Sequence, residues 1–299
     1  MTDHSYSDRS DTIKSFPLSF KAWLWWPMAS ALAAILLWAT LASLAFRLSH
    51  LSPFFLTGAG MVIGSLTLLP SWRQWRLPWR TFAIGVSALS LYHAALFAAL
   101  QWAPAVSANL VNYLWPLFIV VLAPLVQKDQ KFSVRVVLAG LIGFAGAALA
   151  IVGDQGLHFE KRALIGYALA FIAALIWSLY SLSLKRLPPF PNAAVGLFTL
   201  GAGIFSLGIS SLTETLPVLQ AHDWFYLAAI GAGPLGLAFF FWDKAAKTLP
   251  ARQLGVLSFL TPVLSTAFLS FVSGAAPAGA LIISVVLIIF AMVLTFRPK

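Results

Sequence analysis

Ten apolar stretches follow one another along this 299-residue chain, each long enough to cross a lipid bilayer as a helix. A spanning helix needs about 20 mostly apolar residues, and it satisfies its own backbone polar groups where no water is present. Only 9% of the residues are charged, whereas a soluble domain has about 25%. The sequence therefore predicts an all-α polytopic membrane protein with ten transmembrane helices. The stretches cover residues 24–46, 52–70, 81–101, 104–126, 134–152, 163–184, 193–213, 224–242, 250–272 and 277–295.

Lysine and arginine residues gather on one side of these ten helices. If the N-terminus is cytoplasmic, sixteen of the 19 Lys and Arg residues lie in cytoplasmic segments, and the other side holds only Arg47, Lys161 and Arg162. Cytoplasmic loops of membrane proteins carry an excess of these residues. We therefore expect both termini in the cytoplasm. The net charge of +10 reflects this topology, and we expect no nucleic-acid partner.

The two halves of the chain resemble each other. Residues 37–48 align with residues 176–187, which pairs Trp38 with Trp177. A second alignment pairs two prolines of each half, Pro104 with Pro250 and Pro116 with Pro262. Because each half has five spans, an odd number, the two copies must cross the membrane in opposite directions. We expect two inverted five-helix repeats.

The repeat sets the expected organisation of the chain. The first residues are polar, which is typical of a disordered tail. The expected parts are a disordered cytoplasmic tail (1–22), a first repeat (23–152), an external loop (153–162) and a second repeat with a short C-terminal tail (163–299).

This arrangement resembles the drug/metabolite transporter superfamily, specifically its EamA-type branch. In this family a short loop is followed by two prolines twelve positions apart. The pairs Pro104 and Pro116, and Pro250 and Pro262, match this pattern. The run N-Y-L-W-P at 112–116 is similar to a segment of YddG-type aromatic amino-acid exporters. Members often carry Gly-Glu near the ends of spans four and nine, but residues 127–129 and 273–275 lack it. The resemblance implies an alternating-access transporter in a bacterial inner membrane.

The expected span centres contain no Asp, Glu, Lys or Arg. Ionisable groups inside a membrane are costly and mark ion or proton pathways. Their absence favours a cargo without net charge and argues against a carboxylate proton relay. His93 is the only histidine in the core of an expected span, about 12 Å from the outer end of its helix at 1.5 Å per residue. Tyr113 lies at a similar depth in the next span.

The candidate substrate-binding residues are polar or aromatic and lie well inside the spans. Tyr92 points about 100° away from His93, so we do not expect both to share one cavity wall equally. Residues 239–242 are all aromatic and end the eighth span, and we expect one or two to face the cavity. The candidates are His93, Tyr113, Trp115, Asn109, Asn112, Trp177, Trp38, Tyr92, Phe97 and Phe240.

Structural roles remain open for the same residues. His93 could hydrogen-bond a neighbouring helix, the two asparagines could join helices, and the tryptophans could be packed or lipid-facing bulk. Three prolines free backbone carbonyls inside spans, which neighbours or cavity water must satisfy. These prolines, Pro116, Pro234 and Pro262, are the expected hinges.

The first functional hypothesis is an exporter of neutral amino acids, with aromatic ones preferred, working by facilitated diffusion. The alternative is an exporter of other neutral metabolites or drugs, proton-coupled through His93. A membrane enzyme is a third hypothesis, but the chain lacks G-x-S-x-G and H-E-x-x-H motifs and has no cysteine. We expect no catalytic residue, metal site or cofactor. The expected partners are a small-molecule substrate and the lipid bilayer.

Overall fold

The structure is a computed structural model that describes residues 18–127, 130–153, 160–274 and 279–296. These residues form helices and connecting turns, without a β-strand among them. The helices of the first half are α1 (Leu18–Arg47), α2 (Pro53–Thr67), α3 (Trp79–Trp102), α4 (Ala105–Asn112), α5 (Trp115–Val126) and α6 (Val134–Val152), with a 3-10 turn η1 (Leu69–Gln74). Those of the second half are α7 (Leu164–Ser183), α8 (Val195–Thr213), α9 (Ala221–Ala232), α10 (Ala238–Thr248), α11 (Ala251–Ser258), α12 (Leu260–Ser273) and α13 (Ala280–Phe296). Short turns η2 (Lys161–Ala163) and η3 (Asn192–Ala194) precede α7 and α8, and a π-helical turn η4 (Gly233–Leu237) joins α9 to α10.

Eight helical segments of the described chain are long and apolar enough to cross a membrane, by length and composition. Two shorter apolar helices, Pro53–Thr67 and Ala280–Phe296, coincide with two further expected spans. Three spans are built from two helices each: α4 with α5, α9 with α10, and α11 with α12. The protein is an all-helical polytopic membrane protein.

Each of the three interrupted spans contains one of the expected hinge prolines. Pro116 is at the start of α5, directly after the break between α4 and α5. Pro234 lies in the π-helical turn η4, and Pro262 lies in the first turn of α12. Proline lacks the N–H that an α-helix needs at interior positions, so helices begin or change hydrogen-bond pattern there.

The structure changes two of the expected boundaries. Helix α1 begins at Leu18, so the end of the expected 1–22 tail is helical, while residues 1–17 lie outside the described residues. The eighth span does not end at residue 242, because α10 continues to Thr248. Most of the expected external loop, 154–159, also lies outside the described residues.

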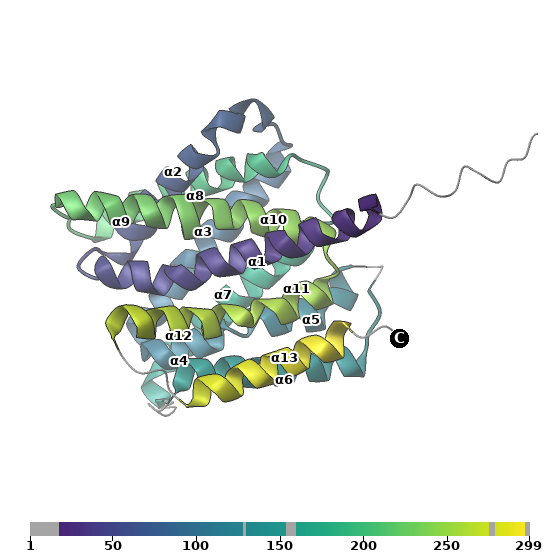
Figure 1. The fold of residues 1–299 in the computed structure, drawn as a ribbon. Helices are drawn as coiled ribbons and strands as arrows, with labels where there is room; N and C mark the ends of the chain where they lie inside the picture. The colour runs from purple at the N-terminus through teal and green to yellow at the C-terminus, as the bar shows by residue number, and fades with distance from the viewer. Residues whose placement is uncertain (1–17, 128–129, 154–159, 275–278, 297–299) are drawn as a thin grey trace, which may run out of the picture.

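The two halves of the chain interlock. Helix α1 packs between α10 and α12 of the second half (Figure 1), and α7 packs against α3, α4 and α5 of the first half. The pairs α2–α8 and α6–α13 also join the halves. Helix α1 begins and α13 ends at the same end of the bundle, which we call the terminal end. The opposite end carries the turn between α1 and α2, and we call it the α1–α2 end.

Close packing between the halves depends on a glycine in α2. A Cβ atom at Gly64 would lie 2.5 Å from the carbonyl oxygen of Leu235 and 2.7 Å from that of Gly231. Small residues let helix backbones approach in this way inside membranes. The absence of a side chain at Gly64 therefore seats α2 directly on α9 and the π-turn.

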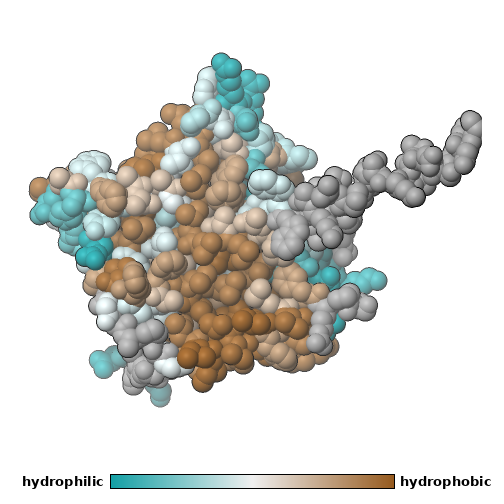
Figure 2. All heavy atoms as spheres, in the orientation of Figure 1, coloured by the Kyte–Doolittle hydropathy of each residue, from teal (hydrophilic) through white to brown (hydrophobic). Residues whose placement is uncertain are grey.

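The surface of the bundle matches a lipid environment. Figure 2 shows hydrophobic residues across the middle of one face and down to its lower margin, with hydrophilic residues mainly at its top and at its left and right sides. Phe271, Ile282 and Phe225 are among many large apolar side chains that are more than two-thirds exposed. Such a surface is stable against hydrocarbon and unstable in water.

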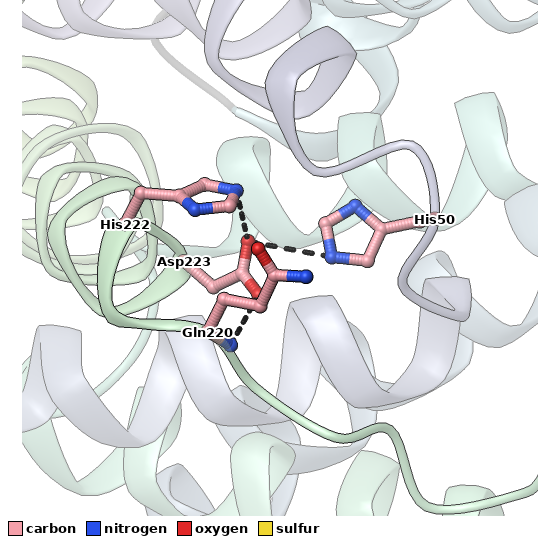
Figure 3. A network of polar contacts seen from close by, with 4 residues as sticks. All are labelled: His50, Gln220, His222 and Asp223. Atoms are coloured by element: carbon pink, nitrogen blue, oxygen red, sulfur yellow. Dashed lines mark hydrogen bonds and ion pairs between the residues drawn. The ribbon is translucent and has the colours of Figure 1, made fainter.

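Polar contacts tie the loops together at the α1–α2 end (Figure 3). The Nε2 atoms of His50 and His222 lie 3.3 and 3.2 Å from Asp223 Oδ1. Asp223 Oδ2 accepts a hydrogen bond from the backbone N–H of Gln220 at 2.8 Å, which closes a capping box at the start of α9. Glu214, which follows α8, accepts hydrogen bonds from Ser52 and from two backbone N–H groups at the start of α2. The α1–α2 turn is therefore bound to the second half of the chain.

Candidate functional site

A cavity of about 430 Å³ lies between α1, α2, α3, α4, α7 and the π-turn η4. It extends from buried aromatic side chains near the middle of the bundle to the α1–α2 end. There its wall includes Ser49, Pro53 and Leu100, which are exposed on the surface. The cavity therefore opens at the α1–α2 end.

Tightly packed aromatic rings close the other end of the cavity. Four tryptophans and a phenylalanine form this aromatic cluster: Trp38, Trp115, Trp177, Trp242 and Phe239. The ring centroids of Trp38 and Trp177 are 5.6 Å apart, and those of Trp115 and Trp242 are 5.4 Å apart, both nearly perpendicular. Edge-to-face contacts at these distances are favourable, because a positive ring edge meets a negative ring face. The cluster joins α1, α5, α7 and α10 into one barrier.

Hydrogen bonds fix two of these indole rings. Trp38 Nε1 donates to the carbonyl oxygen of Pro234 at 3.0 Å, and Trp242 Nε1 donates to Ser181 Oγ at 3.1 Å. A buried indole N–H is costly without a partner. The positions of the rings are therefore set by hydrogen bonding as well as by packing.

Polar groups line one side of the cavity above the aromatic cluster. Asn112 Nδ2 donates to the Tyr92 hydroxyl at 3.4 Å, while Asn112 Oδ1 has no hydrogen-bond partner among the described residues. His93 Nδ1 lies 2.7 Å from the carbonyl oxygen of Leu89. Because a carbonyl can only accept, Nδ1 carries the hydrogen and Nε2 is not used in this bond. Asn112 Oδ1 is thus a buried acceptor without a donor beside the cavity, and His93 Nε2 is not used by the Leu89 bond.

The described wall of the cavity contains no Asp, Glu, Lys or Arg. Its remaining polar groups include Asn109, Tyr113, Thr57 and Thr261, and most of the wall is aliphatic or aromatic. Ligand sites are commonly of this kind, mostly apolar with a few placed polar groups. The arrangement suits a ligand with an aromatic or aliphatic body and a small polar end.

Comparison with known proteins assigns the family. A family model described as the EamA-like transporter family matches residues 25–152 and again residues 164–297. The chain belongs to the EamA-like transporter family. It is a membrane transporter and not an enzyme.

Similar proteins in this family carry a common description. The chain is 36% identical over 265 residues to a protein of Ancylobacter novellus described as an aromatic amino acid exporter, YddG, covering 86% of this chain and 92% of the relative. A protein of Escherichia coli strain K12 with the same description is 28% identical over 254 residues, covering 79% and 85%. A crystal structure that is 33% identical superposes with a TM-score of 0.84, covering 90% of this chain and 97% of the other.

The structure of this EamA-type transporter brings most of the expected site residues together. Nine of the ten line the cavity: Trp38, Tyr92, His93, Phe97, Asn109, Asn112, Tyr113, Trp115 and Trp177. Tyr92 and His93, which we did not expect to share one cavity wall equally, both line the cavity. Their rings are 4.8 Å apart and nearly perpendicular.

The tenth expected residue is not in the cavity wall. Phe240 packs against Phe241 instead, with ring centroids 5.4 Å apart, and the preceding residue Phe239 lines the cavity. Successive helical residues point about 100° apart, so one position decides which face a side chain occupies. Because residues 239–242 are all aromatic, no sequence pattern distinguished Phe239 from Phe240.

One acidic residue, Asp243, lies inside the bundle, although its position was expected to follow the end of the eighth span. Asp243 is in α10 and fully buried, and its Oδ1 accepts a hydrogen bond from the Tyr180 hydroxyl at 2.9 Å. Asp243 follows Trp242, where the eighth span was expected to end. The continuous helix through residue 248 is what buries it.

Proposed function

We propose that this transporter exports neutral amino acids, preferring aromatic ones, by alternating access and facilitated diffusion. The observation that carries the proposal is the cavity itself: its described wall has no charged residue and its closed end is a cluster of aromatic rings. An aromatic cargo can stack its ring there. Its ammonium and carboxylate groups then meet hydrogen-bonding groups rather than fixed charges.

Specific groups are placed to form hydrogen bonds with the polar end of such a cargo. The unpartnered oxygen of Asn112 can accept from the ammonium group, and the hydroxyls of Tyr92 and Tyr113 can donate to the carboxylate. His93 holds its neutral tautomer through the Leu89 carbonyl and leaves Nε2 for the cargo. These are the groups to which we assign recognition, together with Asn109, Phe97 and the tryptophans of the aromatic cluster.

Alternating access is supported by the way the halves interlock. Helix α1 contacts the eighth and ninth spans, and α7, its counterpart in the second half, contacts the third and fourth. The first helix of each half thus packs against the third and fourth spans of the other half, as expected for inverted repeats. The two matches of one family model, 25–152 and 164–297, also support a duplication. We therefore propose ten spans, as two inverted five-helix repeats whose expected bounds are 23–152 and 163–299.

The direction of the cavity follows from the charge distribution. With both termini in the cytoplasm of a bacterium, the α1–α2 end faces the outside of the inner membrane. The cavity then corresponds to an outward-open state, and the aromatic cluster lies between it and the cytoplasm. Rocking about Pro116, Pro234 and Pro262, where three spans are interrupted, is the proposed route to the inward-open state.

Transport by purified protein in liposomes tests the proposal. We expect uptake of labelled phenylalanine and tryptophan that needs no imposed pH gradient and is competed by unlabelled aromatic amino acids. Uptake that appears only with a pH gradient would replace facilitated diffusion by proton coupling. Transport of other neutral solutes without any amino-acid transport would refute the cargo assignment.

A further inference from the structure

A buried acidic pair lies on the cytoplasmic side of the aromatic cluster and does not line the outward cavity. Asp243 of α10 is fully buried, and Tyr180 of α7 is 3% exposed. The Tyr180 hydroxyl donates to Asp243 Oδ1 at 2.9 Å. Both residues adjoin the cluster, since Tyr180 lies 5.5 Å from the Trp177 ring and Asp243 follows Trp242 in the chain.

The Tyr180–Asp243 pair leaves one carboxyl oxygen unused. Asp243 Oδ2 is buried and has no hydrogen-bond partner among the described residues. Lys247 lies one turn further along the same helix, but its Nζ is held by Asn192 Oδ1 at 2.8 Å and by the ring of Phe190. A buried acidic oxygen without a donor is costly, and such groups inside membranes mark sites of ion or substrate contact.

We propose that Asp243 and Tyr180 form the cytoplasmic recognition site for the zwitterionic end of the cargo. In this site the α-ammonium group binds the Asp243 carboxylate, and the cargo carboxylate accepts a hydrogen bond from the Tyr180 hydroxyl. The inference rests on the proposed export of amino acids. It adds a second binding site to the outward cavity, used when cargo enters from the cytoplasm.

The chemistry of the pair fits the two ends of a zwitterion. Any opening toward the cytoplasm that separates α7 from α10 breaks the hydrogen bond between Tyr180 and Asp243. An amino acid then supplies what each partner has lost, a donor for the carboxylate and an acceptor for the hydroxyl. When the cargo leaves, the hydrogen bond between the two side chains forms again, and in the closed state only Asp243 Oδ2 is left without a donor among the described residues.

The position of the pair also fits an aromatic cargo. The ring centroids of Trp177 and Trp242 are 5.8 Å apart, and the two rings are tilted by 30° to each other. They directly adjoin Tyr180 and Asp243 along α7 and α10. A cargo whose polar end is at the pair can therefore place its ring against the cytoplasmic side of the aromatic cluster.

The test measures the KM of each side of the transporter separately. The chain has no cysteine, so a single Ser49→Cys substitution at the cavity mouth can be blocked by a membrane-impermeant maleimide. In liposomes of mixed orientation, this reagent stops molecules with the mouth outward. Uptake by the remaining molecules then reports the cytoplasmic side, and the part of the uptake that the reagent removes reports the outer side.

In this assay Asp243→Asn keeps the acceptor for Tyr180 and removes the charge. We expect it to raise the cytoplasmic-side KM for phenylalanine roughly tenfold or more, because a hydrogen bond between charged groups is lost, and to leave the outer-side KM unchanged. The matched control is Lys244→Gln, which removes a charge from the next residue of α10 and should change neither KM. An unchanged cytoplasmic-side KM in Asp243→Asn, or an equal rise on both sides, would overturn the proposal.

A second pair of measurements separates the two partners. 2-Phenylethylamine carries the ammonium group without the carboxylate, and its competition should weaken in Asp243→Asn but not in Tyr180→Phe. Phenylalanine should bind more weakly on the cytoplasmic side in both variants. If Tyr180→Phe weakens the amine and the amino acid equally, the hydroxyl does not read the carboxylate and that assignment is wrong.

Failure of the proposed function gives a different result. If wild-type protein moves no aromatic amino acid, the proposed function is wrong, and tryptophan fluorescence of purified protein titrated with 2-phenylethylamine decides on the site. Quenching in wild type that is lost in Asp243→Asn would keep Asp243 as an ammonium site. Identical fluorescence titrations of wild type and Asp243→Asn would show that Asp243 does not bind the ammonium group. If wild type transports phenylalanine but Asp243→Asn has the same KM values, only the cytoplasmic site is refuted.

Discussion

The indole N–H of Trp38 donates to the carbonyl oxygen of Pro234, 196 residues further along the chain and 3.0 Å away. Trp38 is in the first helix of the first half, and Pro234 is in the π-turn of the eighth span. Freed backbone carbonyls inside membrane helices must find a partner. This bond therefore joins the closed end of the cavity to an expected hinge in the other half.

Replacing Trp38 by Phe should destabilise the protein through this bond. The ring is largely kept, but the Pro234 carbonyl loses its donor, and we expect a loss of about 1–2 kcal/mol. Thermal unfolding in detergent measures the effect. Trp26, which is 65% exposed, is the control, and Trp26→Phe should unfold at the wild-type temperature. Equal midpoints for both variants would mean that the bond contributes nothing.

Truncation of Trp177 should weaken cargo binding. Its ring lies within 5.4 to 6.3 Å of the rings of Tyr92 and Trp115 at the closed end of the cavity. We expect Trp177→Ala to raise the KM for phenylalanine roughly tenfold, because one stacking surface is removed. Trp177→Phe keeps a ring, and its KM should lie between those of wild type and Trp177→Ala.

The matched control for this prediction is Trp224→Ala, since Trp224 is 58% exposed at the start of α9. Folded protein is checked by gel filtration in each case. Wild-type KM values in a folded Trp177→Ala protein would make Trp177 a packing residue only.

His93 should be dispensable for any response to pH. Its wall neighbours include no acidic side chain among the described lining residues, and facilitated diffusion needs no titrating group. We expect His93→Asn to raise the KM severalfold while uptake stays independent of an imposed pH gradient. A wild-type protein that responds to the gradient, with a His93→Asn variant that does not, would instead assign proton coupling to this residue.

Cysteine labelling should decide the orientation in the membrane. Ser49 lies at the cavity mouth and Gln74 lies at the end of η1, and we expect the two residues on opposite sides of the membrane. In intact cells we expect an impermeant maleimide to label Ser49→Cys, and to label Gln74→Cys only after the membrane is permeabilised. The reverse pattern would place the termini outside and make the cavity inward-open.

The Asp223 cap should matter for stability more than for transport. Asp223→Ala removes the acceptor for the Gln220 backbone N–H and the carboxylate shared by His50 and His222. Loss of a helix N-cap contact costs about 1 kcal/mol. We expect a lower unfolding temperature with an unchanged KM, measured on the same preparation. A changed KM would show that the loops at the α1–α2 end act on the cavity.

Much of the fold could be predicted from the sequence, because the bilayer allows few choices. Long apolar stretches must be helices there, and the positions of prolines such as Pro104 and Pro250 mark where α4 and α11 start. The length of α10 could not be predicted in the same way. In the sequence, Asp243 and Lys247 indicate the end of a span. In the structure the helix continues, and their side chains are hydrogen-bonded by Tyr180 and Asn192, which are both distant in sequence.

The candidate site was predictable to the level of a helix face. His93 and Asn112 were found because polar residues are rare inside apolar segments. Phe239 was missed because a run of aromatic residues has no period that selects one face. Trp242 was missed because tryptophan at the end of a span usually marks the lipid headgroup level, whereas here it is fully buried and bound to Ser181.

The interlocking of α1 with α10 and α12, and of α7 with α3, α4 and α5, has a consequence for how the sequence can change over time. Each half supplies the surface against which the other is packed, so a substitution at this surface in one half constrains the residues allowed in the other half. A substitution at Gly60 of α2 must be matched by a change at Leu235 or Ile230 in the other half, because a Cβ atom there would lie 2.6 and 3.1 Å from their side chains. The two halves can differ in sequence as long as their contact surfaces still fit, and residue pairs that co-evolve should join the halves more often than they fall within one.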